Sequence, residues 1–370
     1  MKVLFPFVGD SVGGSHKSSI ILIQSLILNG VDVHIVLHED NSPLSDYLKL
    51  NKLQYDFLPA KYLAGSSPSV IKIIYGILIN FYAFYSYLYR NKITIVHAND
   101  LRMNLTWSAI VKFTKSKFVW HQRTLLSPSY LWRFIFYLSD YFIAISKIVY
   151  STFPSNIPDL KKQLIYNPIC VDKLYKLNTT SQSIYEQYGI NTDNVLIGYV
   201  GRLSEEWKRV DFLISCLSSC LSNSNYHLLI VGNCDSKYCK QLMKNVINMK
   251  IENKVSFTGF IPDPMFIMAS IDILIAPSRN EPFGRTLLES MSQKTTVLAS
   301  NAGGHREIIS DDNGFLFELD NCVELKNKIK YIQNNHKLVE DRVEKAYLHV
   351  TSQFSPLSHM QKILNLYNTL

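Results

Sequence analysis

The sequence predicts an α/β protein with two domains, each built on a parallel β-sheet. β-rich runs alternate with helical stretches along the chain, which is the pattern of parallel strands joined by crossover helices. The 370 residues are too many for one ordinary core and suit two domains of middling size. Hydrophobic residues make up 47% of the chain and charged residues 18%, a balance that excludes intrinsic disorder.

Local patterns place the individual elements. Strands are predicted at residues 2–5, 31–37, 94–100, 118–123 and 141–146 in the first half, and at 194–201, 227–233, 255–260, 271–278, 295–300 and 313–318 in the second. The first strand is expected to end before Pro6, because proline interrupts a strand ladder. The stretch SHKSSIILIQSLILNG predicts a helix that stops at Gly30.

These elements predict two Rossmann-like domains whose sheets face a central cleft. Residues 1–168 form the first domain, and a helix at about 354–370 returns to it. Residues 169–353 form the second, with the boundary in YNPICVDKLY. Ligands of such sheets bind at the carboxyl ends of the strands, so the cleft is the expected site.

The positive charge is concentrated in the first half of the chain. Residues 1–170 hold 17 Lys and Arg against 9 Asp and Glu, whereas residues 171–370 hold 21 of each. This asymmetry favours an anionic partner, either nucleic acid or an anionic membrane surface, although a lysine-rich composition alone also explains it. The six cysteines form no CxxC pair and no His/Cys cluster, so we expect a reducing, cytoplasmic setting and no structural zinc.

An aromatic run marks a second feature of the first half. Residues 70–89 carry seven aromatic side chains and a single formal charge, Lys72, and a related run, YLWRFIFYLSDYFIA, follows later. The tyrosines and the polar Asn80 and Ser86 argue against a membrane span and favour an interfacial helix or a core helix. Together with the positive charge, the run predicts peripheral contact with an anionic membrane.

Two loops are suited to a phosphate. In GDSVGGSHKS, Gly13 and Gly14 lie between the first strand and a helix, where glycines let the backbone approach an anion at a helix N-terminus; a plain tight turn is the alternative. In GRLSEEWKRVDFLI, Arg202 and Lys208 follow a strand, and their cationic groups suit a diphosphate.

The stretch RNEPFGRTLLESM places two glutamates around a Pro-Phe-Gly turn. Glu281 lies in the loop after the strand IDILIAPS, and Glu289 lies on the helix that follows. Both carboxylates can therefore accept hydrogen bonds from hydroxyl pairs, such as a ribose diol or a sugar ring, while the amides from Phe283 to Thr286 face phosphate or sugar oxygens.

Histidines near strand ends are further candidates. His121 ends the strand FVWHQR, and His97 and Asp100 lie in VHAND at the end of the preceding strand. His16 lies beside the glycine loop. A lone histidine is often only a packed or surface residue, and His97 has this alternative in particular.

On these motifs the chain resembles the family 4 glycosyltransferases of GT-B fold. Three elements carry the resemblance: Glu281 to Glu289 match EPFG-xxxx-E, Gly13 and Gly14 match the Gly-Gly loop, and Gly201, Arg202, Lys208, Val210 and Asp211 match GR…K…VD. NAGGHREII is similar to the loop after the next strand. Two positions depart from the pattern: Arg209 stands where a glycine usually follows the motif lysine, and Asn167-Pro168 replaces Asn-Gly at the hinge.

The resemblance implies transfer of a sugar from a nucleoside diphosphate to a hydroxyl group, with retention of anomeric configuration and without a metal or other cofactor. Arg202 and Lys208 would stabilise the leaving phosphate, Glu281 and His121 would act beside the sugar, and Glu289 would hold the ribose. The implied donor-binding set is Gly13, Gly14, Gly201, Arg202, Lys208, Glu281, Phe283, Gly284, Arg285, Thr286 and Glu289. The acceptor is assigned to the first domain, with His16, His97 and Asp100 as candidates.

The membrane features add an expected role in bacterial surface polysaccharide assembly on a lipid-linked acceptor, at the inner face of the cell membrane. Three alternatives remain open. A nucleotide-sugar epimerase of GT-B type would act on the donor alone, and a non-catalytic protein would only bind it. Nucleic-acid binding would explain the charge, but the sequence holds no recognised binding module.

Overall fold

The computed structural model describes residues 1–63, 70–127, 136–171, 174–175, 184–203, 206–234 and 236–370. The chain divides into two compact units, one formed by Met1–Cys170 with Pro356–Leu370 and the other by Val171–Ser355. Both divisions lie two residues after the boundaries expected from the sequence. The two-domain α/β architecture is confirmed.

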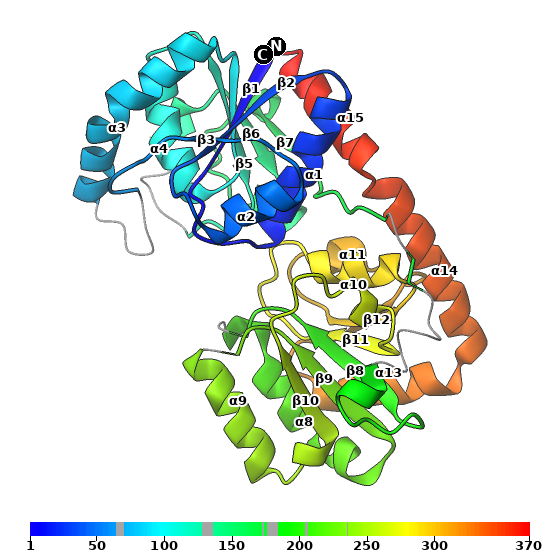
Figure 1. Ribbon diagram of the computed structural model, residues 1–370. Helices are drawn as coiled ribbons and strands as arrows, with labels where there is room; N and C mark the ends of the chain where they lie inside the picture. Colours follow the sequence, from blue (N-terminus) through cyan, green and yellow to red (C-terminus); the bar gives the residue numbers. More distant parts are fainter. Residues whose placement is uncertain (64–69, 128–135, 172–173, 176–183, 204–205, 235) are drawn as a thin grey trace. The chain divides into compact units, whose positions relative to one another are not determined.

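The first unit is built on a seven-stranded sheet in which the strand order is β3-β2-β1-β4-β5-β6-β7 (Figure 1). Every strand pair in it is parallel. The strands are β1 (Lys2–Phe7), β2 (Asp32–Leu37), β3 (Asp56–Phe57), β4 (Ile95–Ala98), β5 (Lys117–Gln122), β6 (Tyr141–Ala144) and β7 (Lys162–Leu164). The helices are α1 (Gly14–Leu28), α2 (Pro43–Leu50), α3 (Val70–Asn91), α4 (Leu101–Val111), α6 (Lys147–Tyr150) and α15 (Pro356–Tyr367).

The first strand continues through Pro6, so the expectation that it ends before this residue was wrong. Lys2 O accepts from Thr94 N on the β4 side, and Phe7 O accepts from His38 N beyond β2. Successive residues of a parallel strand face alternate neighbours, so Pro6 faces β4. Pairing with β4 extends only to Leu4, and the missing proline N–H therefore costs no ladder hydrogen bond.

The helix α15 belongs to the first unit although it ends the chain. Its Met360, Ile363 and Leu366 are buried in one cluster with residues of α1 and of β1.

After the C-terminal end of α1, Gly30 has φ +77°, a conformation in which glycine ends a helix without steric cost. The predicted α1 and its stop are thus confirmed.

The second unit is built on a six-stranded parallel sheet of order β10-β9-β8-β11-β12-β13. The strands are β8 (Val195–Val200), β9 (Tyr226–Val231), β10 (Val255–Gly259), β11 (Ile273–Ala276), β12 (Thr296–Ser300) and β13 (Phe315–Phe317). The helices are α8 (Val210–Asn223), α9 (Lys237–Asn248), α10 (Met265–Met268), α11 (Arg285–Ser292), α12 (His305–Ile308), α13 (Cys322–Asn334) and α14 (His336–Gln353). A buried hydrophobic cluster packs α8, α9 and α13 on one face of the sheet.

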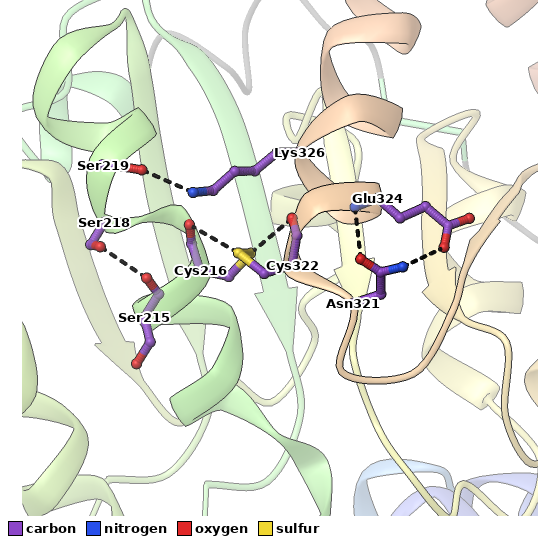
Figure 2. Close-up of a disulfide and its surroundings, with 8 residues drawn as sticks. All are labelled: Ser215, Cys216, Ser218, Ser219, Asn321, Cys322, Glu324 and Lys326. Atoms are coloured by element: carbon purple, nitrogen blue, oxygen red, sulfur yellow. Dashed lines mark hydrogen bonds between the residues drawn. A yellow bond between two sulfur atoms is a disulfide. The ribbon is translucent and has the colours of Figure 1, made fainter.

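Two disulfides lie in the second unit. Cys216 in α8 is bonded to Cys322 at the start of α13, with Cα atoms 5.4 Å apart (Figure 2). Cys234 is bonded to Cys239, five residues later. Sequence spacing gave no sign of either pair, and the expectation of uniformly reduced cysteines does not describe this unit. Disulfides are typical of oxidising compartments, so they weigh against the reducing setting inferred from spacing.

Candidate functional site

The candidate site begins where the strand order of the second sheet reverses. β8 pairs with β9 on one side and with β11 on the other, and ligands of open α/β sheets bind at such a switch point. β8 leads directly into Gly201 and the exposed Arg202, while β11 leads into the loop that carries Glu281. The topology therefore brings together two motifs that lie about eighty residues apart in sequence.

An ion pair joins these two loops. Lys208 Nζ lies 2.6 Å from Glu281 Oε2, and the two side chains are 15% and 17% exposed. Lys208 Nζ also lies 4.3 Å from the centre of the Trp207 ring. A cation that is held by a carboxylate and an aromatic face has a fixed position, so a charge-stabilising group is already placed at the switch point.

The charge state of Glu281 follows from its neighbours. Burial raises the pKa of this carboxyl, but the charges of Lys208 and His305 and hydrogen bonds from Lys208 and Ser278 outweigh burial, so the net shift is downward. Burial lowers the pKa of His305, despite the opposing charge of Glu281. At neutral pH Glu281 is therefore a carboxylate, held beside the Lys208 side chain.

Two glycines hold the Pro-Phe-Gly turn in place from behind. Gly304 N donates to Glu281 O at 2.8 Å, and a Cβ at Gly304 would lie 2.5 Å from Phe283 O. A Cβ at Gly303, where φ is +56°, would lie 2.6 Å from Glu281 O. Phe283 is only 3% exposed. Phe283 and Gly284 of the turn are buried, and the turn is held by the NAGGHREII loop.

The helix α11 starts at this turn and carries the second glutamate. Gly284, at φ +110°, is its N-cap. Arg285 Nε donates to Glu289 Oε1 at 2.7 Å one helical turn later, and both side chains are about 15% exposed. The guanidinium of Arg285 thus orients the carboxylate proposed to hold a ribose, a role that the sequence did not suggest for the arginine side chain.

A pocket at the switch point brings four of the predicted residues together. Its lining includes Lys208, Glu281, Gly284 and Thr286, and the remaining residues are Tyr199, Val200, Ala276, Ser278, Leu287 and His305. His305 was not among the predicted site residues, although it lies in the NAGGHREII loop. The signal was available, because this histidine follows a Gly-Gly pair just after the strand next to β11.

In the first unit the glycine loop begins α1. Gly13 is the N-cap, and its N–H donates to His16 Nδ1 at 3.1 Å. This bond explains the position of His16, whose pKa is lowered chiefly by burial. A Cβ at Gly13 would meet nothing within 4 Å, so local packing does not require the glycine, and space beside the loop is open.

The structure places His97 and His121 in the interior, and the role beside the sugar that the resemblance implies for His121 stays a prediction, as does the acceptor role of His97. Both are 0% exposed, and His97 Nε2 lies 3.0 Å from His121 Nδ1. His97 Nδ1 lies 2.5 Å from the hydroxyl of Tyr367, and the His121 ring stacks on that of His359. The reason is α15, which carries Tyr367 and His359 across these strand positions.

Asp100 has a structural contact of its own. It is the N-cap of α4 and accepts from Arg102 N at 2.8 Å. Arg102 also binds Asp10, with Nη1 2.6 Å from Oδ2. Asp100 therefore caps a helix and orients an arginine, and the acceptor contact expected of it stays a prediction.

The comparison with protein families concerns the second unit, where the switch-point pocket lies. Residues 181–349 match the model of the glycosyl transferases group 1. The second unit is a group 1 glycosyl transferase domain. This domain contains the Lys208–Glu281 pair, the Arg285–Glu289 pair and the buried turn between them.

Solved structures resemble the whole chain around this group 1 domain. The chain matches Anabaena HepE, crystallised in complex with UDP and glucose, over 100% of both chains with a TM-score of 0.83 and 22% identity. It matches a glycosyltransferase from Rickettsia africae with a TM-score of 0.87 and 22% identity, over 100% of this chain and 98% of the other. The chain therefore has the GT-B fold.

A curated relative is the O-antigen biosynthesis glycosyltransferase WclY of Escherichia coli, which is 27% identical over 244 residues. That alignment covers 65% of this chain and 64% of WclY, so it spans less than two thirds of the relative's length.

Among the described ranges, no helix is long and apolar enough to cross a membrane. Those same ranges hold no group of three His, Cys, Asp or Glu side chains suited to a metal.

Proposed function

We propose that the protein transfers a sugar from a nucleoside diphosphate sugar to a hydroxyl of a glycan acceptor, with retention of configuration. The observation that carries the proposal is the Lys208–Glu281 pair at the switch point of a group 1 glycosyl transferase domain. The cation suits the charge that develops on a leaving diphosphate. The carboxylate suits the hydroxyls of the sugar.

In the proposed reaction the bond from the anomeric carbon to the phosphate oxygen breaks, and a bond to the acceptor oxygen forms on the same face. The acceptor proton moves to the leaving phosphate, so atoms and charge balance without a metal or other cofactor. Arg202 and Lys208 stabilise the diphosphate, Glu281 orients the sugar, and Glu289, held by Arg285, accepts hydrogen bonds from the ribose.

The backbone completes the proposed donor site. Amides of Phe283, Gly284, Arg285 and Thr286 at the start of α11 face donor oxygens, helped by the partial positive charge of the helix N-terminus. A Cβ at Gly201, which follows β8, would lie 2.7 Å from Tyr199 Oη, so packing favours glycine there. The Gly13–Gly14 loop of the first unit gives close backbone approach to phosphate or sugar oxygens.

Product analysis tests this function. UDP-, GDP- and ADP-sugars are incubated with the protein and a lipid-linked glycan acceptor, and the product linkage is assigned by NMR. Transfer with the anomeric configuration of the donor supports the proposal. Conversion of the donor to an epimer without acceptor points to an epimerase, and binding without turnover points to a non-catalytic protein; either result contradicts it.

The first unit adds a surface suited to a membrane. On α3, Ile71, Leu78, Tyr82 and Tyr89 are each at least 68% exposed, and residues three, four or seven positions apart share one helix face. On the opposite face, Phe84 is 0% exposed. The helix thus combines a core face with an exposed apolar face, whereas the sequence posed these as alternatives.

Basic residues beside this apolar face support an anionic bilayer as its partner. The helix α3 contains Lys72 and Arg90 and no acidic residue. Phe113, 68% exposed, extends the face through its contact with Phe81, and Lys112 is adjacent to it in sequence. Apolar and basic side chains on one helix are typical of interfacial binding. The second aromatic run lies partly outside the described residues.

Vesicle sedimentation tests the membrane partner. We expect the protein to pellet with vesicles that contain phosphatidylglycerol and to remain in the supernatant with pure phosphatidylcholine. Leu78→Glu and Tyr82→Glu should abolish pelleting, whereas Leu348→Glu, at an equally exposed leucine of α14, should not. Equal pelleting of all three variants, or concentration-dependent dimerisation without vesicle binding, would contradict this partner.

We place the protein on the inner face of a bacterial cell membrane, acting in surface polysaccharide assembly. WclY, named for O-antigen biosynthesis, supports this role. This face lies in the reducing cytoplasm, so the proposal requires the Cys216–Cys322 and Cys234–Cys239 pairs to be open there. Rapid alkylation of thiols in intact cells tests it: four or more alkylated cysteines per chain agree with a cytoplasmic site, and protection of all but Cys170 and Cys220 contradicts it.

A further inference from the structure

The residue after Lys208 has an unusual backbone conformation. Arg209 has φ 57° and ψ 36°, in the left-handed region, and is the N-cap of α8. This region favours glycine, because a side chain there crowds the backbone. The sequence departs from its resembling motif at this position, where arginine replaces the usual glycine. The contacts of the Arg209 side chain therefore bear on how the fold holds this conformation.

An ion pair supplies that stabilisation. Arg209 Nη1 lies 2.6 Å from Asp320 Oδ1, and the arginine side chain is 15% exposed. Its guanidinium also lies 5.4 Å from the centre of the Phe212 ring. Asp320 itself has φ 62°, so the pair joins two left-handed residues, neither of which is glycine.

The same aspartate binds a second arginine. Asp320 Oδ2 accepts from Arg279 Nη2 at 2.6 Å and from Arg279 Nε at 3.2 Å. Arg279 N also donates to Trp207 O at 2.9 Å. Asp320 is thus bonded to a neighbour of Lys208 in one loop and to a residue two positions before Glu281 in the other.

The aspartate lies on a firmly anchored segment. The next residue, Asn321, caps α13 by accepting from Glu324 N at 3.1 Å. Cys322 is bonded to Cys216 of α8, and Lys326 Nζ donates to Ser219 Oγ at 2.9 Å, which places the start of α13 against α8 (Figure 2). Asp320 therefore presents its carboxylate from a fixed position and not from a free loop.

We infer that Asp320 is a positioning residue of the donor site, which sets the geometry of the Lys208–Glu281 pair by binding Arg209 and Arg279 together. This inference rests on the proposed function, since the pair it positions is the one proposed to hold the donor. Asp320 does not touch the substrate. Glycine would adopt the left-handed backbone at position 209 without steric cost, and here the ion pair with Asp320 is inferred to hold an arginine in that conformation.

Kinetics of three variants test the inference. Asp320→Asn keeps the side-chain shape and removes the charge, and asparagine tolerates the left-handed backbone. We expect this variant to raise the KM for the donor about tenfold, which is the equivalent of one lost charged hydrogen bond. Adding Arg209→Gly to this variant should recover part of the loss, because glycine needs no ion pair at φ 57°. The control is Asp341→Asn, which removes the exposed Asp341–Lys345 pair of α14 and should leave the donor KM unchanged.

The pH profile separates positioning from mere stability. Lys208, His305 and Ser278 face Glu281, and if Asp320→Asn loosens the Lys208 contact, the pKa of Glu281 rises toward its ordinary value. The acid limb of the rate profile should then move to higher pH in Asp320→Asn and stay in place in Asp341→Asn. An unchanged KM and an unchanged acid limb would overturn the inference while leaving the proposed function intact.

A measurement without substrate keeps the two proposals distinguishable. If the wild-type protein uses no UDP-, GDP- or ADP-sugar, the proposed function fails, and a crystal structure of Asp320→Asn still tests the positioning. Separation of Lys208 Nζ from Glu281 Oε2 beyond hydrogen-bond range supports the role of Asp320. An unchanged pair, with Arg209 still left-handed, overturns it.

Discussion

Lys208 Nζ and Glu281 Oε2 lie 2.6 Å apart although 73 residues separate them in sequence. The pair exists because β8 and β11 are neighbours at the point where the sheet order reverses. It supplies a cation and a carboxylate in fixed positions at one pocket.

Replacing Glu281 by glutamine should change the acid stability of the protein. The pKa of Glu281 lies below its ordinary value of 4.5 in the folded state, so its contribution is present above pH 4.5 and is lost as pH falls through the lower folded pKa. At pH 7, Glu281→Gln should reduce the free energy of unfolding by about 2 kcal/mol, since Lys208 loses a charged partner. Urea unfolding at pH 7 and pH 3.5 measures both effects; equal losses at the two pH values would contradict the assignment.

Removing the Glu289 carboxylate should weaken donor binding without unfolding the protein. Glu289→Ala loses the group that Arg285 orients, and we expect the dissociation constant for the selected nucleotide sugar to rise at least tenfold, or about 1.4 kcal/mol. Glu344→Ala is the matched control, since it removes an exposed pair with Lys294 on the same unit. Isothermal titration should find control and wild type alike, and equal weakening in both variants would refute the role.

The glycine behind the Pro-Phe-Gly turn should not tolerate a side chain. In Gly304→Ala the new Cβ would lie within 2.8 Å of three backbone atoms of Phe283, so the turn must shift. We expect a destabilisation of about 1–3 kcal/mol, as for other overpacked sites, together with loss of transfer activity. Thermal unfolding and product formation measure the two effects, and a variant that matches the wild type in both would show that the turn is not held from behind.

Gly13→Ala should behave in the opposite way. A Cβ at Gly13 has open space around it and φ there is −137°, so the melting temperature should stay within 1–2 °C of the wild type, about 0.5 kcal/mol or less. If the loop approaches phosphate or sugar oxygens, the donor KM should nevertheless increase. Unchanged kinetics would remove Gly13 from the proposed donor site.

The buried histidines should control stability and not the chemical step. Burial holds the pKa of His121 well below 6.5, whereas the unfolded chain binds a proton near that pH, so its contribution is present above pH 6.5 and is lost as pH falls below it. Between pH 6 and pH 5 the free energy of unfolding of His121→Gln should fall by about 1.4 kcal/mol less than that of the wild type. Urea titrations at both pH values measure this, and a lowered kcat with wild-type stability would restore the catalytic assignment.

The alternation of strands and helices predicted most of the fold, because parallel strands buried on both faces form continuous apolar runs. Every strand predicted from such a run occurs in the structure. The sequence missed β3 and β7, which have only two and three residues and therefore too little hydrophobic pattern. The sequence also predicted that β1 ends before Pro6. One strand alone does not show which neighbour a proline faces, or whether pairing with that neighbour has already ended.

The sequence predicted the site residues that belong to a local motif. It did not predict those whose position depends on tertiary packing. Lys208 and Glu281 sit in loops after strands, and strand order brings them together. His121 also sits in a strand, but α15 covers it, and no local pattern indicates where a helix more than two hundred residues away will pack. Arg209 is the clearest limit, because it combines a left-handed backbone with an ion pair to Asp320, a partner 111 residues later that no local pattern indicates.

The most direct test of the central claim is protection against thermal unfolding by UDP-, GDP- and ADP-sugars, compared between the wild type and Lys208→Ala. Lys345→Ala, which loses an exposed pair with Asp341, serves as the control. We predict that one nucleotide sugar raises the Tm of wild type and control with increasing concentration and has no effect on Lys208→Ala. Stabilisation of all three proteins alike, or of none, would contradict a donor site built on the Lys208–Glu281 pair.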